Sequence, residues 1–132
     1  MRTPREFTMQ SLEVTVTVRT YPTESEEKIL KILKNVFPGI DIRKVGDYII
    51  GKGDALDVLI SMIKRERIAA RAYNLFKKRR RGDEIIIPLE RDPLASGRIS
   101  FGEEGEFPPI WVEIRGNVDE VLARLRDLAD AK

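Results

Sequence analysis

The sequence contains no cysteine and no histidine. Without cysteine the chain can form neither a disulfide nor a thiolate zinc site, and it has no thiol nucleophile. Without histidine it lacks the commonest general base, the Ser-His pair of many hydrolases and most transition-metal chemistry. We therefore expect a protein that is not an enzyme, with no cofactor, no bound metal and no small-molecule substrate.

Long hydrophobic runs are missing as well. No apolar stretch approaches the roughly 18 residues of a membrane span, and no signal-type segment is present. We therefore expect a cytoplasmic protein without membrane contact. The 132 residues suffice for one domain with a sizeable core. Residues 1–10 include Pro4 and show no periodicity, which predicts a disordered tail before a single domain at 11–132.

Positive charge is concentrated in one stretch, from Lys64 to Arg81. This stretch holds nine Lys or Arg residues and one acid, Glu66, so it carries +8 while the whole chain carries +2. The other 114 residues therefore sum to −6. Charge that is segregated by segment indicates a polyanionic partner better than the overall pI does.

The same stretch shows the periodicity of a helix. Its apolar residues recur at helical spacing and predict one buried face: Ile68, Ala72, Leu75 and Phe76. A second set falls on the opposite side and predicts a cationic ridge: Arg67, Arg71, Asn74, Lys78 and Arg81. Gly82 is placed to end such a helix. Phosphate binding needs a ridge of this kind, because neutralised phosphates release counterions.

These considerations select a set of candidate RNA-binding residues. The set comprises the basic residues of the stretch: Lys64, Arg65, Arg67, Arg71, Lys77, Lys78, Arg79, Arg80 and Arg81. The alternative is a solvated face, since cations near a helix C-terminus also complement its dipole. The helix dipole accounts for one or two cations, however, and here five follow one another at 77–81.

Alternating residues elsewhere predict strands, at Leu12–Arg19, in two pieces between 40 and 52 around a Gly46-Asp47 turn, at 84–89, at 98–101 and at 110–115. Pro88 suggests an edge or a strand end. Helices are predicted to begin at Thr23, Asp54 and Asn117. The helix from Asp54 runs into the basic segment near Arg65, and the sequence leaves open whether it forms one bent unit with the basic helix or a helix pair. Because the clear strands alternate, the sheet has one buried face. The prediction is an α+β two-layer sandwich: a mixed, mostly antiparallel sheet of five to six strands with helices on one face.

Four segments resemble an archaeal family of uncharacterised proteins, namely Val14–Val16, Tyr21–Glu24, Arg65–Ala72 and Gly97–Phe101. That family is grouped with predicted RNA-binding, exosome-associated domains, and its fold is like a large-subunit ribosomal protein that contacts the small ribosomal RNA. The resemblance covers roughly residues 11–130. It implies an α+β domain and RNA binding, but it transfers no activity and no site residues.

Three functions remain open. The leading one is a non-catalytic RNA-binding module that contacts the phosphate backbone through the basic helix. The second is a protein-interaction or homodimerisation module that uses the open sheet face, where Trp111 is predicted to point outward. The third is a metal-dependent phosphoester hydrolase built on carboxylates such as Asp92, Glu103 or Glu104, although no paired acid spacing supports it.

Overall fold

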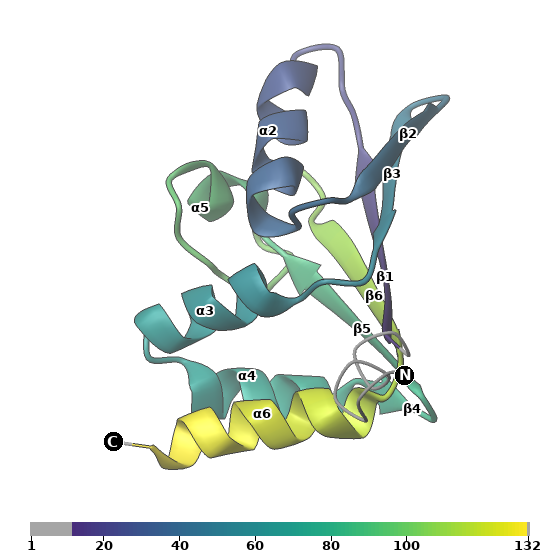
Figure 1. Ribbon diagram of the computed structural model, residues 1–132. Coiled ribbons are helices and arrows are strands. Elements are labelled where there is room, and N and C mark those ends of the chain that lie inside the picture. Colours follow the sequence, from purple (N-terminus) through teal and green to yellow (C-terminus); the bar gives the residue numbers. More distant parts are fainter. Residues whose placement is uncertain (1–11, 132) are drawn as a thin grey trace.

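The computed structural model describes residues 12–131, and residues 1–10, predicted to be a tail, lie outside them. The elements are β1 (Leu12–Arg19), α2 (Glu26–Val36), β2 (Asp41–Val45), β3 (Tyr48–Gly53), α3 (Asp57–Arg65), α4 (Ala69–Lys78), β4 (Arg80–Arg81), β5 (Glu84–Leu89), α5 (Arg91–Ala95), β6 (Ile110–Gly116) and α6 (Val118–Asp130). The strands form one sheet in the order β2-β3-β1-β6-β5-β4, and every named pair is antiparallel. The helices cover one face of this sheet and leave the other open (Figure 1). The predicted α+β two-layer architecture is confirmed.

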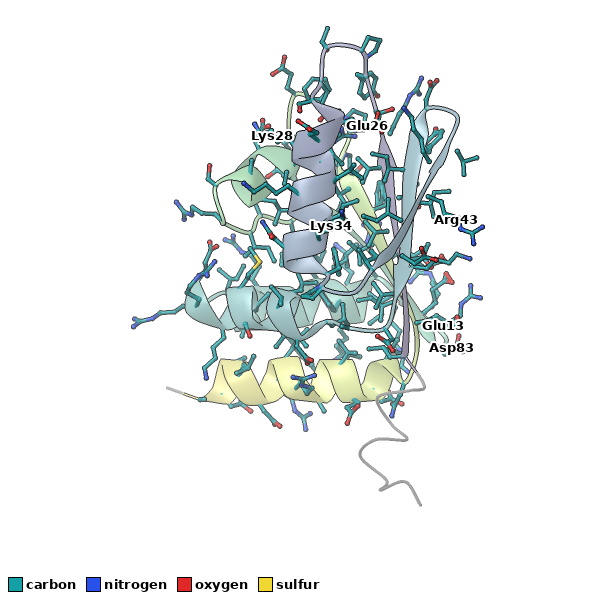
Figure 2. The ribbon with its side chains drawn as sticks, turned by 45° about the horizontal axis from the view of Figure 1, so that its top comes forward. Glu13, Glu26, Lys28, Lys34, Arg43 and Asp83 are labelled. Carbon is teal, nitrogen blue, oxygen red and sulfur yellow. The ribbon has the colours of Figure 1, made fainter. Side chains whose placement is uncertain are left out.

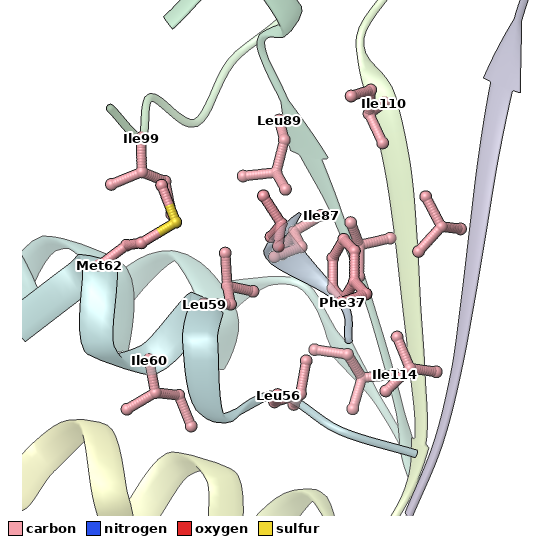
Figure 3. Close-up of a cluster of buried hydrophobic side chains, with 14 of the residues drawn as sticks. Phe37, Leu56, Leu59, Ile60, Met62, Ile87, Leu89, Ile99, Ile110 and Ile114 are labelled. Atoms are coloured by element: carbon pink, nitrogen blue, oxygen red, sulfur yellow. The ribbon is translucent and has the colours of Figure 1, made fainter. Parts of the chain in front are cut away.

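The core lies between the sheet and the helices. On β1 the residues Val14, Val16 and Val18 are buried while their neighbours on the other face are not, as the alternation predicts. Apolar side chains of β5, β6 and α3 belong to the same continuous hydrophobic cluster as these valines (Figure 3). Because only one face is buried, the register that places the valines inward also decides which side chains line the open face.

Helix starts were predicted less well than strands. Ser25, not Thr23, caps α2, and its Oγ accepts a hydrogen bond from the amide of Lys28 at 3.3 Å. α3 begins after Leu56 without a side-chain cap, so Asp54 is not the cap residue. Asn117 caps α6 as predicted. A capping side chain works only where the backbone turns, and several neighbouring polar residues offer the same chemistry.

The basic stretch takes in the end of α3 and the whole of α4, so of the two alternatives that the sequence left open, one bent helix or a helix pair, the pair is the one formed. α3 ends at Arg65, and Arg67 takes the left-handed conformation with φ 58° while the amide of Ile68 bonds back to the carbonyl of Ile63. This is the usual geometry of a helix end, but the left-handed residue is normally glycine. With an arginine in that position, the sequence alone does not decide between one bent helix and two helices.

The other end of the stretch also departs from the helix. α4 stops at Lys78, and Arg80 and Arg81 form the short edge strand β4. Gly82, with φ 62°, lies after β4 and before β5 rather than ending the helix. The predicted ridge therefore survives only as the part of α4 that carries Arg71, Asn74 and Lys78.

Residues 90–109 also differ from the prediction. The helix α5 was not anticipated, and the expected strand at 98–101 is reduced to one bridge between Leu89 and Phe101. Pro88 does lie near a strand end, as predicted, and its missing N–H does not interrupt the pairing of β5 with β6. No helix within residues 12–131 combines the length and apolar character that a membrane crossing requires.

Sequence reasoning missed the one buried charged residue of the described chain, Arg91, which is 5% exposed. Its guanidinium donates to the carbonyl oxygens of Arg19 and Pro108 and to the carboxylate of Glu24, at 2.6, 2.7 and 2.5 Å. The central carbon of the guanidinium lies 5.9 Å from the ring centre of Tyr21 and 5.6 Å from that of Phe107. Every guanidinium nitrogen is thus satisfied, and Arg91 ties the start of α5 to the end of β1 and to the segment before β6.

Candidate nucleic-acid interface

The cations of the basic stretch divide into two groups. In the first group the side chains are exposed and make no hydrogen bond or ion pair with residues 12–131: Lys64, Arg67, Arg71, Lys77 and Lys78. We call these the free cations. They lie on α4 and at the corner between α3 and α4, and only Lys77 has a further contact, with its Nζ 5.8 Å from the ring centre of Tyr73.

The single acid of the stretch does not neutralise them. Glu66 is turned toward the segment after α5, where one carboxylate oxygen accepts the amide of Ile99 at 2.8 Å. Its other oxygen lies 3.7 Å from Arg98. The free cations therefore keep their charge without an intramolecular counterion in the described part of the chain.

The second group consists of cations that already have partners. Arg65 donates to the carbonyl oxygen of Gly97 at 2.6 Å, and Arg79 to that of Ile86 at 2.6 Å. Arg81 donates to the carbonyl oxygen of Arg80 at 2.9 Å. Within the described part of the chain, Arg80 is the one member of this group that contacts a carboxylate, that of Asp119 on α6, at 2.5 Å. These cations stabilise local structure, so the predicted set does not act as one uniform ridge.

The free cations extend along the whole of α4. Arg71 and Lys78 are two turns apart on its outer side. Lys64 and Arg67 border a hollow of about 580 Å³ at the N-terminal end of α4, where α6 supplies Leu128 and Ala129. Since α4 has 10 residues, this array is about 15 Å long. An array of this length can meet several phosphates of one nucleic acid strand.

Trp111 lies on the open face, as predicted. On β6 it stands opposite Thr17 of β1 and Pro88 of β5, and its side chain is half-buried. The guanidinium of Arg79 lies 5.7 Å from the centre of its ring, a cation–π distance. Two features that sequence reasoning treated separately, the basic stretch and the outward Trp, therefore come into contact beside β5, with Trp111 on the inner strand β6.

The rest of the open face is amphipathic. Val45, Tyr48 and Ile86 are its exposed large apolar residues, at 57%, 42% and 36%. Arg43 of β2 projects away from the helix layer (Figure 2). Arg115 bonds to Glu84 at 2.6 Å and lies 3.8 Å from Glu113. The hydrogen bond from Arg115 to Glu84 raises the pKa of Arg115 above its usual value, so this cation is already matched by acid.

The acidic residues considered for metal-assisted hydrolysis do not converge. Within residues 12–131 there is no group of three or more His, Cys, Asp or Glu side chains that could hold a metal ion. Glu103 and Glu104 are exposed in the irregular segment before β6, and Asp92 is exposed in α5. This arrangement adds nothing to the hydrolase hypothesis.

The fold and this surface define a small α+β protein with one open sheet face and a basic helix at its edge. No family model matches the chain. It is 32% identical over 111 residues to a UPF0200/UPF0201 protein of Archaeoglobus fulgidus, covering 82% of this chain and 34% of that protein. The chain thus spans about a third of that relative's length.

A UPF0201 protein of Pyrococcus abyssi is 31% identical over 119 residues, covering 85% of this chain and 86% of that protein. A crystal structure of an uncharacterised UPF0201 protein superposes with a TM-score of 0.77 at 31% identity, over 83% of this chain and 89% of that one. The chain belongs to the UPF0201 family, an uncharacterised archaeal family. The names of these relatives mention neither a ribosome nor an exosome, so the finer part of the resemblance gains no support.

Proposed function

We propose that this protein is a non-catalytic RNA-binding module that contacts the phosphate backbone through α4 and the corner before it. The observation that carries the proposal is the array of free cations, which has no intramolecular counterion among residues 12–131. Holding like charges close together costs free energy unless an anionic partner arrives. A phosphate backbone supplies that partner, and the released counterions favour the complex.

Three of the free cations, Arg71, Lys77 and Lys78, lie on one rigid element, α4, which favours recognition of backbone shape rather than of base sequence. α4 is anchored by Ala72 and Phe76, which are 0% and 1% exposed, so its outer side keeps a fixed spacing of charges. The open face carries only Trp111 and Tyr48 as aromatic residues on its strands, too few for a row of stacked bases. Contacts with phosphate and ribose should therefore dominate.

The test is fluorescence anisotropy at several salt concentrations with a blunt RNA duplex of about twelve base pairs, annealed from two separate strands. With about five phosphate contacts, the logarithm of the association constant should fall against the logarithm of the salt concentration with a slope of about −4 to −5. The absence of binding at low salt, or an affinity that salt does not change, would contradict the proposal.

A second candidate function is homodimerisation through the open sheet face. Its specific support is the exposed apolar pair Val45 and Tyr48 at the β2–β3 hairpin, on the same face as Trp111. A second copy meeting this face would bury these side chains. Sedimentation of the wild type, of a Val45→Lys/Tyr48→Lys variant and of Trp111→Ala tests it. A monomeric wild type, or a dimer that persists in all variants, excludes this interface.

A further inference from the structure

Where β4 meets β5, the surface forms a hollow of about 330 Å³ lined by Lys78, Arg79, Arg81, Glu84 and Ile86. This volume falls within the range of small-ligand sites, about 300–1,000 Å³. The hollow lies at the C-terminal end of α4, where the array of free cations ends beside the open sheet face. Its lining combines cations with the exposed aliphatic side chain of Ile86. Phosphate contacts along α4 do not require an aliphatic side chain.

The charge of the hollow is strongly positive. Three of its lining residues are cations, and its one acid, Glu84, is engaged with Arg115 at 2.6 Å. Lys78 has no ion-pair partner among residues 12–131. Among residues 12–131, Arg81 contacts only the backbone carbonyl oxygens of Lys78 and Arg80, so no carboxylate of this part of the chain neutralises its charge. An anionic group is the ligand that this lining favours.

A planar group fits the same hollow. Arg79 is held by two contacts, its Nε donating to the carbonyl oxygen of Ile86 at 2.6 Å and its guanidinium lying 5.7 Å from the ring centre of Trp111. A guanidinium plane fixed in this way is a stacking surface for a nucleic acid base. Ile86, 36% exposed, adds apolar contact area beside it.

We propose that this hollow binds one unpaired nucleotide of the RNA, with its phosphate at Lys78 and Arg81 and its base against Arg79 and Ile86. This inference rests on the proposed function and adds a preference for RNA in which a single strand adjoins a duplex. Bases inside a duplex are stacked on one another and present no free face, so a blunt duplex leaves the hollow empty. The free cations of α4 contact phosphates both in a blunt duplex and in a duplex that adjoins a single strand.

The experiment compares two RNA duplexes that carry the same net charge, each annealed from two separate strands so that no loop supplies unpaired bases. One has a single-stranded tail of about six nucleotides, and the other has a tail of equal length made of abasic sites. We expect the tail with bases to bind at least about fivefold more tightly, the lower limit of what stacking one base contributes. Ile86→Glu should remove this difference and leave the binding of the blunt duplex reduced by less than about twofold.

The matched control is Val45→Glu, which places the same charge at a more exposed position on the same face, on β2 at the opposite edge of the sheet. This variant should retain the difference between the two tails. If circular dichroism shows that Ile86→Glu is unfolded, Ile86→Thr removes most of the apolar contact with a residue that suits a strand.

The outcomes separate the two proposals. If the blunt duplex binds with the expected salt slope but the bases of the tail add nothing, the nucleotide site is wrong and the proposed function stands. A preference for the tail with bases that persists in both Ile86 variants also overturns the site. If neither the blunt nor the tailed duplexes bind, both proposals fail.

Discussion

Arg91 and Arg71 carry the same charge in opposite surroundings. Arg91 is buried, contacts the carboxylate of Glu24 and two carbonyl oxygens, and lies against two aromatic rings. Arg71 is exposed and has no hydrogen-bond or ion-pair partner among residues 12–131. A cation that is fully satisfied by its own chain holds the fold together, whereas one without a partner is available to a ligand. The difference between these environments, rather than the number of basic residues, defines the candidate interface.

The largest effect is expected from Arg91→Met. This change leaves the carboxylate of Glu24, whose side chain is 12% exposed, without its counterion. Breaking a buried ion pair by removing one partner costs about 3–5 kcal/mol of the free energy of unfolding. Chemical denaturation measures this loss.

The control for Arg91 is Arg98→Met, because Arg98 is also paired with an acid but is 75% exposed. The Arg98→Met variant should lose at most about 1 kcal/mol of the free energy of unfolding. If the two variants lose similar stability, the contrast between buried and exposed cations is wrong.

The next effect is expected from the double variant Arg71→Glu/Lys78→Glu. RNA affinity should fall at least about tenfold at moderate salt, and the magnitude of the salt slope should decrease by about two, one for each lost phosphate contact. The free energy of unfolding should change by no more than about 0.5 kcal/mol per site, since neither side chain has an ion-pair partner in residues 12–131.

Lys31→Glu/Lys34→Glu on α2 is the matched control, with an equal change in net charge on another exposed helix surface. Figure 2 shows Lys34 on α2, which is separate from α4. If both double variants weaken RNA binding equally, binding depends on the overall charge of the protein and the assignment to α4 fails.

The smallest effect, and the sharpest test, concerns Arg67. Its φ of 58° is the left-handed conformation, which costs a residue with a Cβ about 1 kcal/mol and glycine almost nothing. Arg67→Gly should therefore stabilise the fold by about 1 kcal/mol while lowering the magnitude of the salt slope by about one.

Arg67→Ala separates the two effects, because it removes the charge but retains the backbone strain. It should lower the salt slope as Arg67→Gly does without raising the melting temperature. If RNA binding is unchanged in both variants, Arg67 is not a phosphate contact.

The strands and the core could be predicted from the sequence because the patterns that indicate them involve residues close together in the chain. The alternation of Val14, Val16 and Val18 with polar residues requires one buried face whatever the partner strands are. The sequence left open whether the helices on either side of Arg67 form one bent unit or a pair, because the left-handed residue that ends a helix is usually glycine and here it is arginine. The short strand β4 was hidden as well, since two arginines acquire strand geometry only by pairing with Glu84 and Ile85.

The candidate interface was predictable in its charge but not in its shape. The run of cations at 77–81 indicates an anionic partner. It does not show that Arg80 is paired with Asp119 while Lys77 and Lys78 have no ion pair with any residue from 12 to 131. The contact between Arg79 and Trp111 could not be predicted either. In the sequence, Arg79 is part of a basic run and Trp111 is an outward residue of a strand, and neither pattern points to the other.

The sequence by itself determined what depends on near neighbours: the alternation that makes strands, the helical stripes, and the segregation of positive charge into one stretch. Only the tertiary structure decided which cations remain without a partner and which are used internally. The reason is that ion pairs and cation–π contacts join residues far apart in the chain, such as Glu24 and Arg91, which are 67 positions apart. Their meeting depends on how the strands are ordered in the sheet, and composition and spacing do not specify that order.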